Sequence, residues 1–321
     1  MLDDPVARDF NKRWNFVMER YADREFLDAL ELALEIRESF PEKFQGEISL
    51  GIACIYTRLG QLDNAVHGLE KAMGDGHWWS KSELLQIPAL EPLRERADFN
   101  TLVDRCEALQ HSAQASSKPD LLVFPPPSGL TRSTTILIAL HGRGEMAQNS
   151  APYWKAALSM GVLLACPGSS QPYGRNGFCW DDRERARMEV AKVYSQLRAS
   201  HLTDPNQTIV AGYSQGGELA LSLALTPEFP CKGFIAIAPG PFSQTNFEGL
   251  TKALEQSVQR GLRGCLFTGE KDPTYAMTMK MYKEMVGKGM LCEFTADPLL
   301  GHDFPSDFEG KLVSSIKFIL G

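Results

Sequence analysis

The stretch Ile209–Ala224, which reads IVAGYSQGGELALSLA, passes from an apolar, β-branched segment directly into a segment typical of a helix. Ser214 stands at the junction in a Gly-x-Ser-x-Gly pattern, with Gly212 and Gly216 on either side. Glycines at these positions leave room for a sharp strand-to-helix turn that exposes a nucleophilic hydroxyl. A tight turn in which the serine only caps the helix is the alternative. Motifs elsewhere in the chain are needed to distinguish these interpretations.

The second part of the chain alternates between strand-like and helix-like segments. Short apolar or β-branched runs predict strands at 121–124, 135–140, 162–166, 208–211, 233–237, 265–268 and 291–295. Helices are predicted at 182–200, 215–225, 247–260, 275–286 and 307–320. This alternation predicts an α/β fold with a mainly parallel sheet flanked by helices. In such sheets functional residues gather beyond the carboxyl ends of the strands.

Two further residues follow predicted strands and complete a chemical set with Ser214. Asp272 lies beyond the next strand but one, and His302 follows the last predicted strand. Glu270 and Asp297 are rival acids, and Asp272 also suits the start of a helix. A serine hydroxyl needs an imidazole to take its proton and a carboxylate to orient that imidazole. The chain order serine, aspartate, histidine therefore predicts a catalytic triad.

A glycine-rich loop, His141-Gly-Arg-Gly144, follows the strand predicted at 135–140. A loop of this kind can supply one backbone N–H to an oxyanion, while the residue after the nucleophile supplies the other. The predicted donors are the amides of Arg143 and Gln215, with Gly142 as a predicted substrate contact. A plain turn at the end of a strand is the alternative. A dinucleotide site is disfavoured because the third glycine is missing.

Four motifs together give this region a family resemblance. They are H-G-x-G at 141–144, G-Y-S-Q-G-G at 212–217, G-x-x-D-P at 269–273 and G-H at 301–302. On these motifs the chain from about residue 120 to its last residue resembles the phospholipase/carboxylesterase group of α/β-hydrolases, which includes acyl-protein thioesterases. The resemblance implies a serine hydrolase of carboxylic esters or thioesters that forms an acyl-enzyme, with no cofactor and no metal.

The same resemblance implies that Trp180 lines the substrate site, because relatives carry a tryptophan and an acid near the acyl pocket where this chain has Phe178-Cys-Trp-Asp-Asp182. A tryptophan of the hydrophobic core is an equal alternative. Arg143 departs from the family, which has an apolar residue after His-Gly. A cation there would favour an anionic leaving group or acyl chain, although exposed arginines usually serve only as solvated surface. The resemblance therefore leaves the substrate open.

The first part of the chain has a different periodicity. Between about Pro5 and His111 apolar residues recur at intervals of three and four, which predicts amphipathic helices in antiparallel hairpins. Asp28-Ala29 and Asn64-Ala65 stand 36 positions apart in two such pairs. This pattern resembles a tetratricopeptide repeat, but Arg24 replaces the expected glycine in the first unit. We expect a smaller all-α domain at 1–112, a linker at 113–120 and an α/β-hydrolase domain at 121–321.

Composition limits the partners and the compartment. The 321 residues carry a formal charge of -7, which disfavours nucleic acid as a partner. The seven cysteines form no C-x-x-C pair, so neither a disulfide framework nor a zinc site is expected. The amino terminus lacks the features of a signal peptide, and no segment has the length of a membrane span. We expect a cytoplasmic protein.

Two other functions fit the same motifs. A peptidase or acyl-aminoacyl hydrolase would use the same serine, histidine and aspartate, because the histidine can also protonate an amine leaving group. A peptide-binding helical repeat with an incidental hydrolase fold is the second alternative, since repeat arrays commonly present concave binding faces. The small acyl ester or thioester remains the main expected substrate, with a peptide or protein partner possible for the helices.

Overall fold

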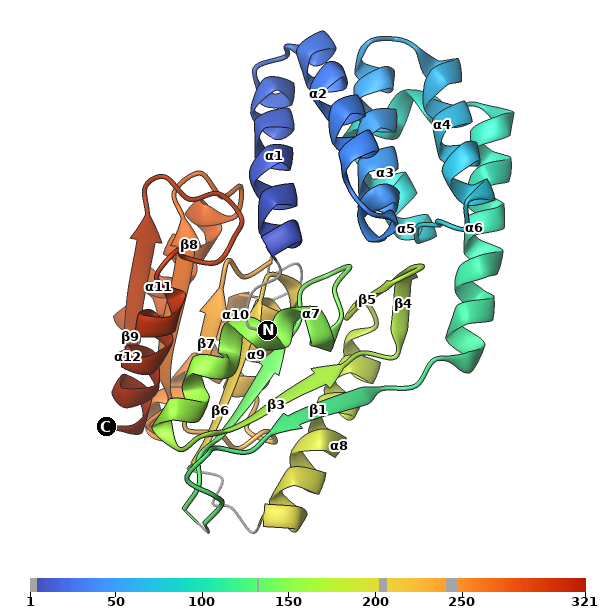
Figure 1. Cartoon of the computed structure of the whole chain (residues 1–321). Helices are drawn as coiled ribbons and strands as arrows, with labels where there is room; N and C mark the ends of the chain where they lie inside the picture. Colours follow the sequence, from blue (N-terminus) through green and yellow to red (C-terminus); the bar gives the residue numbers. More distant parts are fainter. Residues whose placement is uncertain (1–4, 132, 202–206, 241–246) are drawn as a thin grey trace. The chain divides into compact units, whose positions relative to one another are not determined.

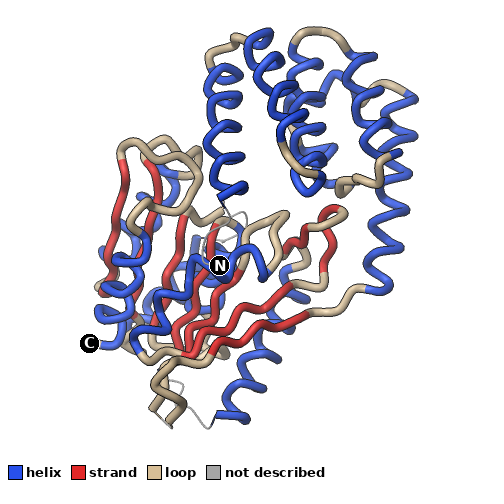
Figure 2. Tube along the Cα trace, viewed as in Figure 1, coloured by secondary structure: helices blue, strands red, loops and turns tan. Residues whose placement is uncertain are grey.

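The computed structural model describes residues 5–131, 133–201, 207–240 and 247–321 (Figure 1). The chain divides into two compact units, which comprise Met1–Ser117 with Pro172–Gly177, and Lys118–Gln171 with Phe178–Gly321. We call them the helical unit and the sheet unit. Figure 2 shows helices joined by short loops in the part of the chain that spans residues 5–116, and the strands of a sheet in the later part.

The helical unit is built from successive helices that pack on their neighbours in the chain. They are α1 Pro5–Ala22, α2 Phe26–Ser39, α3 Glu42–Arg58, α4 Leu62–Gly74, α5 Lys81–Gln86, the 3-10 helix η1 Pro88–Leu93, and α6 Ala97–Ser116. Buried alanines such as Ala29, Ala33 and Ala65 let neighbouring helices approach closely. Part of the segment predicted as a linker is helical, because α6 continues to Ser116 through two alanines, which favour helix.

The turn between α1 and α2 has the same geometry as the turn between α3 and α4. Three successive backbone N–H groups donate hydrogen bonds in this turn. That of Arg24 donates to the carbonyl three positions earlier, that of the preceding residue to the carbonyl four positions earlier, and that of the following residue to the carbonyl five positions earlier. Gly60 and its two neighbours make the same three bonds. Arg24 has φ 63° and Gly60 has φ 73°, both left-handed. The two helix pairs thus share one turn, although only the second has the glycine that this conformation favours.

Arg24→Gly should stabilise the protein by about 0.5 kcal/mol. Relief of left-handed strain is worth about 1–2 kcal/mol and is partly offset by the greater freedom of glycine in the unfolded chain, about 0.5–1 kcal/mol. Urea denaturation followed by circular dichroism measures the change. Arg24→Ala is the control, because it removes the guanidinium but keeps the Cβ. Equal stability of the glycine and alanine variants would contradict the explanation.

The sheet unit alternates strands and helices. Its elements are β1 Asp120–Phe124, β2 Ile136–Leu140, α7 Ala147–Trp154, the 3-10 helix η2 Lys155–Met160, β3 Leu163–Gly168, β4 Gln171–Gly174, β5 Gly177–Cys179, α8 Arg183–His201, β6 Thr208–Tyr213, α9 Gln215–Leu225, β7 Gly233–Ile237, α10 Phe247–Gln259, β8 Arg263–Gly269, α11 Tyr275–Gly287, β9 Leu291–Asp297 and α12 Phe308–Leu320. Among the described residues, no helix combines the length and apolar character needed to cross a bilayer.

Seven of these strands form one sheet in the order β1-β3-β2-β6-β7-β8-β9 (Figure 1). Only the edge strand β1 runs antiparallel to its neighbour, so the predicted mainly parallel sheet is confirmed. Leu140 pairs with Gly212, and Gly269 pairs with Asp297. The loops that follow β2, β6, β8 and β9 therefore begin at the same edge of the sheet.

Alternate residues along the central strands feed two hydrophobic cores. On β2, Ile136, Ile138 and Leu140 pack in one cluster with residues of α8, α9, α10 and α11. Leu137 and Ala139 pack in the other cluster with α7 and α12. Helices therefore cover both faces of the sheet, as expected for strands that are apolar on both sides.

A short hairpin, β4 with β5, contributes its tip to the helical unit. The backbone N–H of Ser80 donates to Tyr173, and Trp79 forms an isolated antiparallel bridge with Gly174. Arg175 pairs with the carboxylate of Glu42 at 2.8 Å. These contacts join residues far apart in the chain, and no short-range pattern in the sequence predicts them.

Candidate active site

Ser214 lies in the turn between β6 and α9 in a strained conformation. Its φ is 52° and its ψ is -119°, a region that is costly for any residue with a side chain. Two backbone hydrogen bonds of 2.9 Å hold it there, from its N–H to Ile237 and from Gly240 to its carbonyl. Its side chain makes no capping bond to α9, so the structure does not show the capping alternative.

The glycines around Ser214 are required by close backbone contact. A Cβ at Gly212 would lie 2.3 Å from the backbone of Gly216. A Cβ at Gly216 would lie 2.4 Å from the carbonyl oxygens of Leu140 and His141. Real side chains do not tolerate such distances, so the start of α9 can pack on the ends of β2 and β6 only without a Cβ.

Gly216→Ala should therefore destabilise the protein by about 3 kcal/mol or prevent folding, because its methyl group has no space against backbone atoms. Gly310→Ala is the matched control. It also lies in the first turn of a helix, α12, but its Cβ would meet no described atom within 4 Å outside that helix. The control should gain about 1 kcal/mol from helix propensity. Thermal and urea denaturation compare the two, and equal effects would contradict the packing argument.

His302 bridges the serine and the aspartate. Its Nε2 lies 2.8 Å from Oγ of Ser214, and its Nδ1 lies 2.8 Å from Oδ2 of Asp272. The Asp272 side chain has no exposed surface, whereas the His302 side chain is 36% exposed. The structure thus brings together the three residues predicted as a triad, within hydrogen-bonding distance.

Close packing between two loops sets this geometry. A Cβ at Gly269 would lie 1.9 Å from the carbonyl oxygen of Leu300, so the end of β8 touches the loop that carries His302. The N–H of Lys271 also donates to Leu300 at 3.1 Å. The rival acid Asp297 instead accepts a hydrogen bond from the backbone of Leu299. Among the described residues His302 is hydrogen-bonded to Asp272 and to neither rival acid.

Hydrogen bonds keep Asp272 in the charged form. Burial by itself raises the pKa of this carboxyl group, but hydrogen bonds from His302 and from Thr274 outweigh it and hold the pKa below its usual value. Thr274 donates both its backbone N–H, at 2.7 Å, and its hydroxyl, at 2.8 Å, to Oδ1. Oδ2 is therefore left to accept from the histidine, which fixes the orientation of the carboxylate.

The loop of His302 is anchored by residues that the sequence interpretation did not single out. The Tyr213 hydroxyl donates to the carbonyl oxygen of His302 at 2.8 Å. Burial raises the pKa of Tyr213, so this phenol stays protonated as a donor. Phe304 stacks on Tyr153 with ring centroids 4.1 Å apart and also contacts the Tyr213 ring. An aromatic residue directly before the serine and another two positions after the histidine were the available signals.

The His-Gly-Arg-Gly loop is held on both sides of Arg143. The N–H of Gly142 donates to Oε2 of Glu145 at 2.9 Å, and the N–H of Gly144 donates to the carbonyl of Phe178 at 2.8 Å. Burial raises the pKa of the Glu145 carboxyl group above its usual range. The Arg143 guanidinium itself pairs with Asp181. The predicted donor Gln215 is the first residue of α9, where an amide has no acceptor within the helix.

His141 and Trp180 lie beneath this loop. Both side chains are fully buried, and their rings are 4.8 Å apart. Burial lowers the pKa of His141 to about 4, so the ring is neutral. Its Nε2 accepts from the N–H of Ser169, which places the ring proton on Nδ1 opposite the carbonyl of Gly142. The Trp180 indole donates to the carbonyl of His141 at 2.9 Å, so this tryptophan supports the loop from the core.

The site is composed of side chains and backbone groups suited to acyl transfer. It contains a serine hydroxyl, an imidazole and a carboxylate joined by hydrogen bonds, which are the groups that acyl transfer requires, and the first amide of α9 follows the serine. Within the described part of the chain, no group of three or more histidine, cysteine, aspartate or glutamate side chains has a geometry that could hold a metal ion.

No family model matches the sequence, and no curated protein matches it either. A solved structure of an uncharacterized protein from Bacillus cereus ATCC 10987 is 25% identical, with a TM-score of 0.55, and the match covers 96% of this chain and 97% of that chain. Esterase PE8 is 19% identical with a TM-score of 0.51 and covers 61% of this chain and 97% of that chain. A ferulic acid esterase is 14% identical with a TM-score of 0.50 and covers 64% and 93%.

The first of these matches includes the helical part as well as the sheet, because it spans nearly all of both chains. The two esterases match about three fifths of this chain and are similar to it in fold. The sheet order and its flanking helices agree with that fold. The resemblance predicted from the motifs is confirmed at this level: the chain has the fold of the α/β-hydrolases, joined to a helical unit that contains its amino-terminal part.

Proposed function

We propose that the sheet unit is a serine hydrolase that cleaves carboxylic esters or thioesters through an acyl-enzyme. One observation carries the proposal: a single imidazole, that of His302, lies between the hydroxyl of Ser214 and the carboxylate of Asp272. An unaided serine hydroxyl is a poor nucleophile, and this arrangement supplies the base that activates it and the acid that orients the base.

In the first step, Oγ of Ser214 attacks the carbonyl carbon of the substrate and its proton passes to Nε2 of His302. Charged Asp272 accepts from Nδ1–H, which leaves the lone pair on Nε2 for that proton. The carbonyl oxygen becomes an oxyanion. The proposed donors to it are the amides of Arg143 and Gln215, which follow neighbouring strands whose ends are in register at Leu140 and Gly212.

In the second step, the tetrahedral intermediate breaks its bond to the leaving group, which takes the proton from His302 and departs as an alcohol or thiol. Water then attacks the acyl-enzyme, with His302 as the base that accepts its proton. The carboxylic acid is released and Ser214 regains its hydrogen. Each step uses groups of the protein alone, so the proposed reaction needs no cofactor or metal.

The motifs resemble those of the phospholipase/carboxylesterase group, so we propose the substrates of that group, carboxylic esters and thioesters, for this chain. The two solved structures of similar fold are an esterase and a ferulic acid esterase, which supports ester hydrolysis in this chain. An amide substrate would use the same residues, because His302 can protonate an amine. Turnover of matched p-nitrophenyl ester, thioester and anilide substrates of one acyl chain separates these classes. A cytoplasmic location stays a prediction.

Ser214→Ala should abolish labelling by a fluorophosphonate probe and lower p-nitrophenyl ester turnover by about 10³-fold or more, because no other hydroxyl lies against His302 Nε2 in the described residues. Ser195→Ala is the control. That serine is exposed on α8 and donates to Ala191, so its loss should leave labelling unchanged. Labelling of the Ser214→Ala variant at the wild-type rate would contradict the proposed nucleophile.

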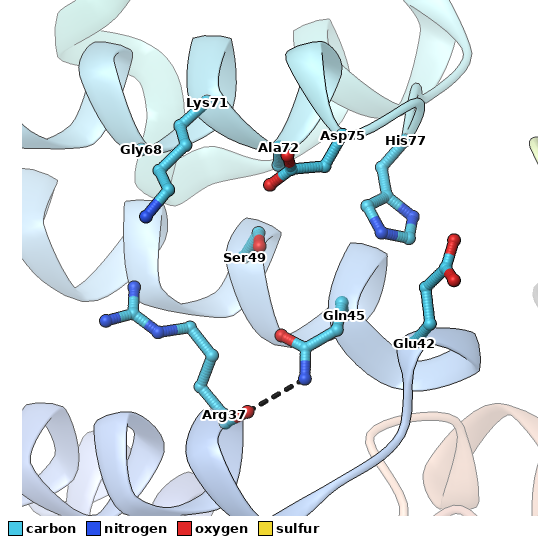
Figure 3. A pocket seen from close by; sticks show the side chains of 9 residues that line it. All are labelled: Arg37, Glu42, Gln45, Ser49, Gly68, Lys71, Ala72, Asp75 and His77. Carbon is cyan, nitrogen blue, oxygen red and sulfur yellow. Dashed lines mark hydrogen bonds between the residues drawn. The ribbon is translucent and has the colours of Figure 1, made fainter.

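The helical unit contains a separate pocket of about 460 Å³ (Figure 3). In Figure 3, Arg37 and Lys71 project to one side of it, whereas Asp75, His77 and Glu42 lie on the other side. Among the residues that the structure describes, neither Arg37 nor Lys71 has an ion-pair partner. The pocket thus has two cations without an ion-pair partner among the described residues on one side and acidic side chains on the other.

We propose as a second function that this pocket binds the carboxylate of a peptide. The two cations supply charge-assisted donors, and Ser49, which also lines the pocket, adds a hydroxyl. Glu42 is already paired with Arg175, which leaves Asp75 as the acid opposite the cations that has no ion pair within the described residues. This charge arrangement favours a peptide end that carries its carboxylate toward Arg37 and Lys71.

The variant with Arg37→Glu and Lys71→Glu should lose binding of a fluorescein-labelled peptide ending in Asp-Asp by about tenfold or more, because the carboxylates would face like charge. Fluorescence anisotropy at low salt measures the affinity, with the carboxyl-terminal amide of the same peptide for comparison. Arg105→Glu, exposed on α6 outside the pocket, is the matched charge control. Equal binding by wild type and the double variant, or no preference for the free carboxylate, would contradict this second function.

A further inference from the structure

The two proposed oxyanion donors lie on separate segments of the chain. Arg143 belongs to a loop with a glycine on each side, and Gly144 has φ 78°. Such a loop has high conformational freedom, so its amide holds one direction only if other groups restrain it. Gln215 begins α9 and is restrained by the helix. The two amides can therefore stay at a fixed distance only if some contact joins the loop to the start of α9.

The segment Phe178–Asp181 supplies contacts to both. Phe178 exchanges backbone hydrogen bonds with the loop, accepting from Gly144 at 2.8 Å and donating to Glu145 at 3.0 Å. Two residues later, the N–H of Trp180 donates to Oε1 of the Gln215 side chain at 2.8 Å. One short stretch of chain thus bonds to the loop and to the first residue of α9.

The carboxylate of Asp181 joins the two donor residues directly. Its Oδ1 accepts from Nε2 of Gln215 at 2.7 Å, and the same oxygen accepts from the guanidinium of Arg143. The Gln215 side chain is buried, with 7% exposure, and has a partner at each end of its amide. Its rotamer is consequently fixed relative to the 178–181 segment.

We propose that Asp181 is a positioning residue that holds the backbone amides of Arg143 and Gln215 at the separation needed to bind an oxyanion. The inference rests on the proposed hydrolase function and extends it to a residue that does not touch the substrate. It also assigns the charge of Arg143 to an internal pair, rather than to recognition of an anionic substrate.

The expected size of the effect follows from the two ways of weakening such a site. Removal of an oxyanion donor costs about 10²–10³ in kcat, and a shift of about 1 Å at the reacting atoms costs about 10². Loss of Asp181 leaves both amides in the chain and keeps the backbone bonds of Phe178 and Trp180, so it only loosens the relative position of the two amides. We therefore expect kcat to fall by about 10- to 100-fold, with KM changed less than about threefold.

The test compares Asp181→Ala and Asp181→Asn with the neighbouring control Asp182→Ala in the full chain. The asparagine variant is expected to keep an oxygen for Gln215 but to lose the charge that pairs with Arg143, so its kcat should be intermediate. Asp182 accepts from the backbone of Arg185 at the start of α8 and contacts neither donor residue, so its loss should leave kcat unchanged. Melting temperatures report on folding, and all rates are corrected for active protein by titration with the probe.

The affinity for a trifluoromethyl ketone inhibitor separates a positioning role of Asp181 from a purely structural one, because a purely structural role would leave this affinity unchanged. The inhibitor forms a hemiketal oxyanion with the serine, so Asp181→Ala should raise its inhibition constant by the same factor by which kcat/KM falls. The inhibition constant of the carboxylate product, which forms no such oxyanion, should change by less than about threefold. Unchanged kcat in folded Asp181→Ala, or a rise in KM alone, would overturn the inference. If the alanine variant does not fold, wild-type kcat in Asp181→Asn has the same meaning. Wild-type protein that resists the fluorophosphonate would instead overturn the proposed function itself.

Discussion

Close contact between backbone segments around Ser214 is the constraint on which the site depends. Gly212 and Gly216 lie so near other backbone atoms that neither position has room for a Cβ. This contact packs the start of α9 on the ends of β2 and β6 and keeps Ser214 at a positive φ. The hydroxyl is thereby presented to His302, and the first amide of α9 is placed beside the loop that follows β2.

A second close contact completes the arrangement from the other side. The absence of a side chain at Gly269 lets the end of β8 touch the loop at Leu300, which sets Asp272 beside His302. Tyr213, the residue before Ser214, then donates its hydroxyl to the backbone carbonyl of His302. The three side chains are thus held by close contacts at Gly212, Gly216 and Gly269 and by the hydroxyl of Tyr213.

Much of this could be predicted from the sequence, because the relevant signals are local. The runs of β-branched residues define the strands to within a few positions, and in a parallel sheet the loops after them meet at one edge. Ser214, Asp272 and His302 each stand in the segment that follows such a strand. The hydrogen bonds of Tyr213 and Asp181 could not be predicted, since a hydrogen bond across the fold leaves no periodic pattern.

The short strands β4 and β5 could not be predicted from the sequence either. Their residues include Pro172, Gly174 and Gly177, which do not suggest strands, and the tip acquires its partners only when Ser80, Trp79 and Glu42 of the helical unit come near it. The helical unit is therefore not a single stretch of chain. Removal of the amino-terminal residues would take away the partners of Pro172–Gly177 as well as the helices.

The most direct measurement is a crystal structure of the protein after reaction with a fluorophosphonate. We predict a phosphorus bond to Oγ of Ser214, with the phosphoryl oxygen within about 3 Å of the amide nitrogens of Arg143 and Gln215. Phosphorus bound to another residue, or a phosphoryl oxygen turned away from both amides, would contradict the account.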